Sequence, residues 1–260
     1  MEIVILPDTA AIGSLAADAI ESLVQRKPNA VLGLATGSSP LAIYDELAAR
    51  YAAGRVSFAQ ARGFTLDEYV GLPVDHPETY RNVIHKDFVD RVDFAPGAVQ
   101  GPDGLATDIP AFCAGYETAI ADAGGVDLQI LGIGTVGHIG FNEPGSSFAS
   151  QTRVKTLTAQ TRSDNARFFD SIDQVPMHCV TQGLGTILRA RHLVLLAFGE
   201  GKADAVAGAV EGPVTSSLPG SAIQLHPHVT VVIDEAAASK LEHLDYYRYA
   251  YDNKPEWQGL

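Results

Sequence analysis

A glycine-rich stretch at 132–144, with the sequence GIGTVGHIGFNEP, carries the residues best suited to proton transfer. Its four glycines allow the backbone to turn tightly beside a ligand. His138 and Glu143 are close enough to pair, and an imidazole oriented by a carboxylate can transfer protons near neutral pH. A metal site is the weaker interpretation, because the two residues lack a third ligand at a helical spacing. A purely structural turn is the alternative, but the density of special residues favours function.

Two adjacent carboxylates, Asp67 and Glu68, open the segment DEYVGLP and are candidates for a general base. Aspartate also starts turns routinely, so this segment taken alone favours a structural role.

A second kind of chemistry, anion binding, is indicated at Thr36, Gly37, Ser38 and Ser39, which precede Pro40. Hydroxyls and free backbone N–H groups at a helix N-terminus attract anions, with help from the helix dipole. A simple capped turn explains this segment equally well.

Two basic residues, Arg167 and Lys202, are candidates for holding a phosphate, Arg167 through two parallel bonds and Lys202 as a point charge. Each taken singly is more typical of a solvated surface charge. His226 and His228 form an HxH pattern that a metal could use. The proline between them and the absence of nearby Cys or carboxylate ligands favour a loop instead.

The elements that must position these residues follow from short apolar runs alternating with helical periodicity. Strands are predicted at 3–6, 30–35, 63–66, 126–132, 192–198 and 229–233. Helices are predicted after a cap at Asp8 or Thr9, from Pro40 to about Gly54, and at 78–90, 108–123, 200–211 and 235–252. We therefore expect an α/β fold with an open, mostly parallel Rossmann-like sheet and helices on both faces. Such sheets bind ligands at the carboxyl ends of their strands, where the candidate residues fall.

Composition narrows the class of protein. The 260 residues carry 18 Lys and Arg against 31 Asp and Glu, a formal net charge of −13, which argues against nucleic acid or an anionic membrane as a partner. The two cysteines fit neither a disulfide framework nor a zinc pattern. Neither a signal peptide nor a run long enough to cross a membrane is recognisable. The sequence predicts a single domain over residues 1–260. It also predicts that the protein is located in a reducing cytoplasm.

Taken together, the motifs resemble the isomerising glucosamine-6-phosphate deaminases over nearly the whole length. The resemblance is carried by ATGSSP, LDEYVGLP, GHIGFNEPGSS, RVKTLTAQTRSDNAR, DQVP, GKADAVAGAVEG and QLHP. It implies conversion of glucosamine 6-phosphate and water to fructose 6-phosphate and ammonium, with no metal or organic cofactor. It further implies that His138 opens the sugar ring, that Glu143 orients His138, and that Asp67 moves the C2 proton to C1. The groups implied to hold the 6-phosphate are Thr36, Gly37, Ser38, Ser39, Arg167 and Lys202.

One position departs from the family pattern. The residue two before the histidine is commonly Asp in the family, whereas this chain has Val136, which can neither ionise nor accept a hydrogen bond. Either His138 and Glu143 suffice for ring opening, or the enzyme is slower, altered in substrate, or a mutated form.

Members of the family also differ in assembly. Several are hexamers activated by N-acetylglucosamine 6-phosphate and others are monomers, so the resemblance implies a homo-oligomer, with a hexamer as one form. Residues resembling the effector site are Ser146, Arg153 and Lys155, and Tyr246 or Tyr247 corresponds to an aromatic residue of that site. A sugar-phosphate sensor is the alternative function. Val136 favours the sensor, while Asp67, His138 and Glu143 favour an enzyme.

Overall fold

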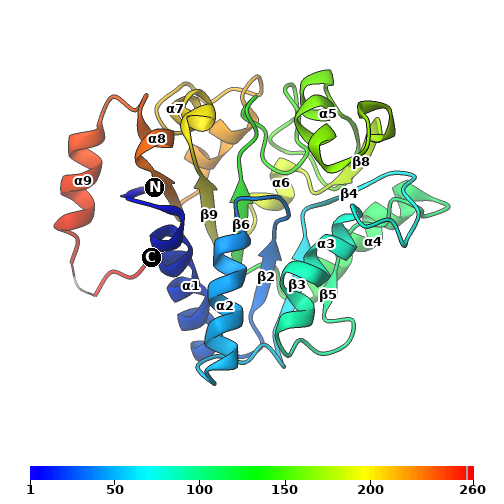
Figure 1. Ribbon diagram of the computed structural model, residues 1–260, viewed down its shortest axis with the longest axis horizontal. Coiled ribbons are helices and arrows are strands. Elements are labelled where there is room, and N and C mark those ends of the chain that lie inside the picture. Colours follow the sequence, from blue (N-terminus) through cyan, green and yellow to red (C-terminus); the bar gives the residue numbers. More distant parts are fainter. Residues whose placement is uncertain (256) are drawn as a thin grey trace.

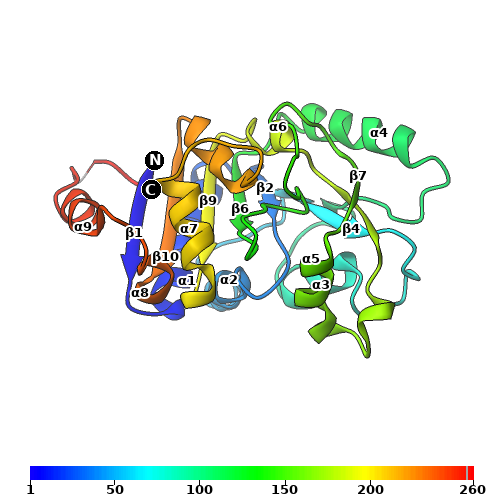
Figure 2. The same cartoon turned by 90° about the horizontal axis from the view of Figure 1, so that it is seen from above.

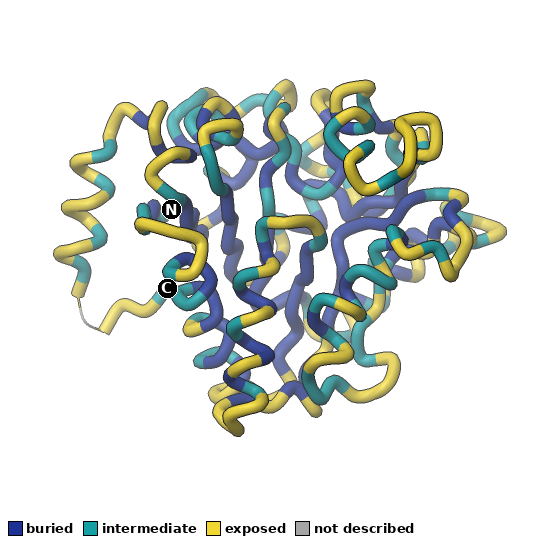
Figure 3. The backbone as a smooth tube through the Cα atoms, viewed as in Figure 1, coloured by how far each residue is buried: buried dark blue, intermediate teal, exposed yellow. Residues whose placement is uncertain are grey.

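Seven parallel strands form the central sheet, in the order β1-β10-β9-β6-β2-β3-β5 (Figure 1). This computed structural model describes residues 1–255 and 257–260. The strands of this sheet are β1 Glu2–Leu6, β2 Val31–Leu34, β3 Arg62–Thr65, β5 Val99–Gln100, β6 Leu128–Gly132, β9 His192–Ala197 and β10 Val229–Asp234. Every residue of β2 and β9 is buried, as expected for strands covered on both faces. The core strands appear as the dark interior of Figure 3.

Helices surround this sheet, with α1 and α2 over one face and α4 and α6 on the opposite side (Figure 2). The α-helices are α1 Thr9–Arg26, α2 Leu41–Ala52, α3 Tyr80–Asp87, α4 Ile109–Asp122, α5 Ala159–Asn165, α6 Leu184–Ile187, α7 Ala203–Val210, α8 Glu235–Ala238 and α9 Leu244–Asp252. Short 3-10 helices are η1 Val89–Arg91, η2 Ala166–Phe168, η3 Ile172–Gln174, η4 Glu200–Lys202 and η5 Pro219–Leu225. The predicted α/β class, with its open and mostly parallel sheet, is confirmed.

A second sheet, of three antiparallel strands, was not expected from the sequence. Its order is β4-β8-β7, with β4 Asp67–Tyr69, β7 Arg153–Thr156 and β8 His178–Thr181. β4 follows β3 after a single residue, Leu66, so the chain leaves the large sheet and enters the small one almost at once. The segment beginning at Asp67, which the sequence favoured as a turn, is therefore a buried strand.

The predicted helix at 235–252 is wrong as one element, because it is broken into α8 and α9. The carboxylate of Glu211 accepts hydrogen bonds from the backbone N–H groups of Glu242 and His243 at 2.7 and 3.0 Å. Tyr247 of α9 donates its hydroxyl to the same carboxylate at 2.9 Å. Glu211 thus stabilises a chain direction that a continuous helix could not follow.

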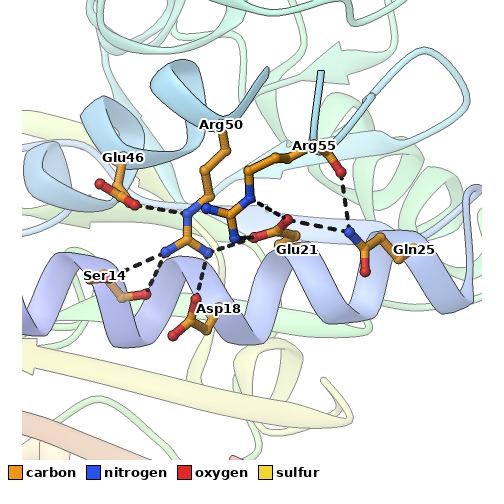
Figure 4. Close-up of polar contacts among 7 residues, drawn as sticks. All are labelled: Ser14, Asp18, Glu21, Gln25, Glu46, Arg50 and Arg55. Atoms are coloured by element: carbon orange, nitrogen blue, oxygen red, sulfur yellow. Dashed lines mark hydrogen bonds and ion pairs between the residues drawn. The ribbon is translucent and has the colours of Figure 1, made fainter. Parts of the chain in front are cut away.

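The positions of α1 and α2 relative to each other are set by close packing and by buried charge (Figure 4). Gly13 lies so near Ala42 that a Cβ would approach its backbone to 2.8 Å, so glycine is needed for this approach. Arg50 of α2 is only 4% exposed and pairs with Asp18 and Glu21 of α1, each at 2.7 Å. Breaking a buried pair on one side leaves an uncompensated charge, which is strongly destabilising. The start of α2, where the predicted anion site lies, is therefore held on a rigid base.

Candidate active site

The carboxyl ends of several strands meet at a cavity of about 270 Å³. Nearly all the residues that the sequence proposed for catalysis and phosphate binding line it: Asp67, His138, Thr36, Gly37, Ser38, Ser39, Arg167 and Lys202. They come from segments far apart along the chain. Their convergence follows from the parallel sheet, whose carboxyl ends share one edge.

The turn between β2 and α2 forms one end of the cavity. Gly37 has a φ of +91°, a conformation that side chains other than glycine rarely adopt. α2 begins at Leu41, one residue later than predicted, and Pro40 is its N-cap without a side-chain hydrogen bond. Leu41, the first residue of this twelve-residue helix, lines this end of the cavity, so the helix N-terminus is a suitable place for an anion.

Two cations lie on the wall of the same cavity. Arg167 belongs to η2, and Lys202 is the last residue of η4, directly before α7. Burial and the neighbouring Arg167 lower the pKa of Lys202, while the carboxylate of Asp164 acts in the opposite direction. Two cations near a helix N-terminus make this end of the cavity electropositive in an otherwise acidic protein.

Asp67 is 7% exposed and lies on β4 opposite Thr181 of β8. Burial and the adjacent carboxylate of Glu68 raise the pKa of Asp67 to about 8, although the backbone N–H of Phe141 acts in the other direction. A carboxyl group with such a pKa can both accept and return a proton near neutral pH.

Glu68 has a different task. Consecutive side chains on a strand point to opposite faces, so Glu68 turns away from Asp67. Its carboxylate accepts the backbone N–H groups of Tyr80 and Arg81, at 3.0 and 2.9 Å, and thereby caps the start of α3. Of the two adjacent carboxylates, only Asp67 lines the cavity.

His138 and Glu143 form the predicted pair, with 3.5 Å between Nδ1 of His138 and Oε2 of Glu143. Both atoms are buried and have no hydrogen-bond partner among the described residues, so they face one another. Burial opposes ionisation of Glu143, but His138, Thr161 and Thr158 outweigh it and lower the pKa of Glu143. Gly134 is required here, since a Cβ on it would stand 2.3 Å from the imidazole.

Val136 lies in the turn between Gly134 and Gly137, where Gly137 donates its N–H to the carbonyl of Gly134 at 2.9 Å. It is half-buried and is not among the residues that line the cavity. In this conformation the valine leaves the contact between His138 and Glu143 in place.

The structure adds cavity residues that the sequence did not single out. α3 contributes Tyr80, Val83 and Asp87, and the segment 158–168, which forms the outer wall of the cavity, contributes Asn165 and Phe168. The spacing 80, 83 and 87 is that of one helical face, which is the signal that could have identified them. The contribution of the outer wall has no such signal, because it depends on the way a distant segment folds over the site.

The residues proposed for an effector lie outside this cavity. Arg153 and Lys155 share one face of β7, and Arg153 donates a hydrogen bond to Oδ1 of Asn142 at 2.7 Å. Ser146 is 2% exposed, and its hydroxyl donates to the carbonyl of Glu143 at 2.6 Å. None of the three lines the active cavity.

The HxH histidines lie elsewhere, at the amino ends of β9 and β10. His226 bonds to the carbonyl of Ala190 at 2.7 Å, and the ring of His228 stacks on that of His192 with 3.7 Å between centroids. In the described part of the chain, no three His, Cys, Asp or Glu side chains are grouped so as to hold a metal ion. The histidines are thus packed in the structure rather than arranged as ligands.

A larger cavity, of about 800 Å³, lies between α3 and α4 and contains Glu68 on its wall. Apart from Glu68, which caps α3, none of the residues proposed for catalysis or phosphate binding lines it. We therefore assign the chemistry to the smaller cavity, since function depends on convergent reactive groups rather than on volume.

Along residues 1–255 and 257–260, no helix combines the length and the apolar character needed to span a bilayer.

Comparison with known proteins agrees with this geometry. The chain is 70% identical to the glucosamine-6-phosphate deaminase of Mycolicibacterium smegmatis and 66% identical to that of Beutenbergia cavernae, with all of both chains covered in each case. A solved structure of a monomeric glucosamine-6-phosphate deaminase is 42% identical, with a TM-score of 0.90 over 92% of this chain and 100% of the other. A 6-phosphogluconolactonase from Trypanosoma cruzi, at 20% identity and a TM-score of 0.76 over 93% of this chain and 97% of the other, shares the fold. The family described as glucosamine-6-phosphate isomerases/6-phosphogluconolactonase matches residues 9–232, and the chain belongs to it.

Proposed function

We propose that this protein is a glucosamine-6-phosphate deaminase, which converts glucosamine 6-phosphate and water to fructose 6-phosphate and ammonium. The observation that carries the proposal is the single cavity lined by a buried carboxyl group, an imidazole and a cationic phosphate site. Relatives that share 60–70% of their residues with this chain over its full length carry the same name. In this proposal the chain 1–260 acts as one domain.

The phosphate of the substrate is held at the electropositive end of the cavity. Backbone N–H groups and hydroxyls of Thr36, Gly37, Ser38 and Ser39 donate to its oxygens. Arg167 and Lys202 add charge-assisted bonds from the opposite wall. Binding at this end leaves the reactive carbons near the acid and base.

His138 opens the pyranose ring. Nε2 of His138 takes the proton of the anomeric hydroxyl and delivers it to the ring oxygen as the bond between C1 and that oxygen breaks, which yields the open-chain aldehyde. As the 3.5 Å contact shortens on substrate binding, Nδ1 of His138 donates to Glu143, which fixes the tautomer whose Nε2 accepts a proton from the sugar. The bonds from Thr158 to the other oxygen of Glu143 hold that carboxylate in place.

Asp67 then moves a proton between carbons. It takes the proton from C2, the electron pair forms the C1–C2 double bond of an enolamine, and the aldehyde oxygen becomes a hydroxyl with a proton from the substrate's own ammonium group. Return of the proton at C1 leaves a C2 iminium ion, and water adds to it with loss of ammonium. The raised pKa of Asp67, about 8, suits both halves of this transfer.

The sensor alternative is not favoured by the relatives of 65–70% identity, which are described as deaminases. Val136 is accommodated in the proposal because it lies outside the cavity lining. We expect His138 and Glu143 to open the ring without a third acidic residue.

Assembly and regulation belong to the same proposal. A homo-oligomer, with a hexamer as one form, would bind N-acetylglucosamine 6-phosphate through Ser146, Arg153 and Lys155. The shared face of Arg153 and Lys155 supports an anion site, although Ser146 would have to leave its bond to Glu143. The relative of 42% identity is described as monomeric, so the assembly of this chain must be measured directly. Two free, buried cysteines agree with a proposed location in the reducing cytoplasm.

The test is an assay of ammonium and fructose 6-phosphate released from glucosamine 6-phosphate, with and without EDTA. Equal amounts of both products, unaffected by EDTA, are expected. Hydrolysis of 6-phosphogluconolactone serves as the comparison, because proteins of that name share the fold. Binding of glucosamine 6-phosphate without any turnover would support the sensor instead and overturn the proposal.

A further inference from the structure

The outer wall of the active cavity is built by residues 158–168, which we call the outer segment. It comprises Thr158, α5 and η2, and supplies Asn165, Arg167 and Phe168 to the cavity. Figures 1 and 2 show α5 at the periphery, away from the seven-stranded sheet. Because Arg167 is exposed and sits on this segment, the place of its guanidinium depends on what attaches the segment to the body.

Besides Arg162, which donates to the backbone carbonyls of Ile172 and Val175, three residues make that attachment through hydrogen bonds. Thr158 donates to Glu143 through its backbone N–H at 3.1 Å, and Asn165 donates to the hydroxyl of Tyr69 at 2.9 Å. The third contact joins Asp164 to Thr135, whose hydroxyl donates to Oδ2 of Asp164 at 2.7 Å. Glu143 belongs to the catalytic pair, whereas Asp164 and Thr135 line no part of the cavity.

The Thr135–Asp164 contact joins the two ends of the site. Thr135 lies in the same turn as Gly134, which packs against the ring of His138. Asp164 is three residues before Arg167. One hydrogen bond thus connects the loop that ends at His138 with the segment that carries the phosphate-binding guanidinium.

We propose that Asp164 is a positioning residue, which uses its bond to Thr135 to hold Arg167 at the phosphate-binding end of the cavity. The proposal rests on the proposed function for the identity of the phosphate ester. It requires only that an anion binds at Thr36–Ser39, Arg167 and Lys202. Asp164 touches no substrate atom and acts through Arg167.

The charge of Asp164 could act independently of its hydrogen bond. It favours the protonated form of Lys202, against the effects of burial and of Arg167. Two substitutions separate the alternatives. Asp164→Asn removes the charge but keeps an oxygen that can accept from Thr135, whereas Thr135→Val removes the bond and keeps the charge.

The experiment measures the dissociation constant of inorganic phosphate by calorimetry, together with KM and kcat for glucosamine 6-phosphate. We expect Thr135→Val and Asp164→Ala each to raise the phosphate Kd and KM about 5- to 10-fold, the scale of one charge-assisted hydrogen bond, with kcat changed less than about twofold. Thr135→Ser restores the hydroxyl and should behave as the unmodified protein does. The double variant should be no worse than Asp164→Ala alone, because both changes remove the same contact.

Gln160→Ala is the matched control. Gln160 donates to the other oxygen of Asp164 at 2.8 Å, but lies on the same helix and does not connect α5 to the body. It should leave Kd, KM and kcat unchanged. The proposal is overturned if Thr135→Val resembles this control, if Asp164→Asn has the full effect, or if the two losses add in the double variant. The phosphate Kd needs no turnover, so failure of this proposal is distinguishable from failure of the proposed reaction.

Discussion

Asp67 and Glu68 are neighbours of similar chemistry, and their environments give them separate roles. Asp67 faces the cavity and has few hydrogen-bond donors near it, so burial keeps its proton bound up to about pH 8. Glu68 receives three backbone N–H groups, from Tyr69, Tyr80 and Arg81. Burial still raises the pKa of Glu68, but these donors oppose it. A base and a helix cap therefore stand side by side on one short strand.

Replacing Asp67 by Asn should lower kcat at least about 10²-fold, because the shape is kept and the proton acceptor is lost. Substrate binding should be nearly retained. Solvent deuterium should exchange into the C2 position with the unmodified enzyme and not with the variant. Equal exchange in both proteins would show that another group is the base.

The raised pKa of Asp67 predicts how the activity and the stability of the protein depend on pH. Asp67 acts as a base when ionised, so kcat/KM should rise as the pH is raised through about 8. Stability should change in the opposite sense. The folded state retains a proton that the unfolded chain has lost between about pH 4 and 8, so the free energy of unfolding should fall as pH rises in that range. The Asp67→Asn variant should lack this slope in a urea titration.

Replacing Arg167 or Lys202 by Ala removes a contact made in both the ground state and the transition state. KM should therefore rise more than kcat falls, and free glucosamine should be a very poor substrate. Steady-state kinetics with both sugars gives the comparison. Equal turnover of glucosamine and its 6-phosphate would contradict the phosphate site.

Val136→Asp introduces the carboxylate common at this position in the family. A carboxylate near an imidazole favours its protonated form, so ring opening should be faster and the activity should extend to higher pH. Phosphate binding should be unchanged, since none of its groups is altered. Paired pH–rate profiles at saturating substrate test the prediction. A variant that is equally or less active throughout would show that the turn is adapted to valine.

At the scale of elements, six of the seven strands of the large sheet were predictable because each lies in a run that is apolar at nearly every position. The seventh, β5, was missed because its two residues, Val99 and Gln100, are too short to form such a run. The small sheet was not predictable. β7 and β8 are short, and the pairing of β8 with β4 joins segments more than a hundred residues apart, so no local pattern reveals the small sheet. The break between α8 and α9 was not predicted for a similar reason, because Glu211, which stabilises it, lies on a segment more than thirty residues earlier.

The same distinction applies to the site. Asp67, His138 and the turn at 36–39 were identifiable because each follows a strand of the sheet and combines unusual residue types. The cap function of Glu68 was not, because its partners are backbone groups 12 and 13 residues away. The contact between Asp164 and Thr135 likewise depends on tertiary structure alone.

The cap predicts the behaviour of Glu68→Gln. The variant keeps only one acceptor oxygen, so a backbone N–H group of Tyr80 or Arg81 loses its partner, and we expect it to be about 1–2 kcal/mol less stable to urea. C2 exchange should persist, unlike in Asp67→Asn. The rise of kcat/KM should move to lower pH, because the Glu68 carboxylate contributes to the raised pKa of Asp67. Complete loss of exchange would mean that the two carboxylates share the proton transfer.

At the scale of the whole molecule, a net charge of −13 surrounds a cavity that must attract a sugar phosphate. The long-range field opposes the approach of the anion, and the local cations and helix N-terminus must overcome it at short range. The anion-binding groups therefore have to be concentrated at one end of the cavity rather than spread over the surface.

Activation by an effector bound in an oligomer should be visible in the assay of ammonium and fructose 6-phosphate release. N-acetylglucosamine 6-phosphate should lower the apparent KM and sharpen a sigmoidal substrate curve, because an effector acts through its unequal affinity for two states. Lys155→Ala should abolish this response. The mass from light scattering should be measured on the same sample. Hyperbolic kinetics unaffected by the effector would assign structural roles to Ser146, Arg153 and Lys155.

The position of β1 has a consequence for the way the chain folds. β1 is an edge strand whose partner in the sheet is β10, with Glu2 opposite Thr230 and Leu6 opposite Asp234. During synthesis β1 is the first strand made, and it cannot pair until β10, the last strand of the sheet, has been made. Closing so long a loop is slow, and an unpaired apolar strand exposes the chain to aggregation. We expect protection of the β1 amides from hydrogen exchange to be among the last to develop during refolding.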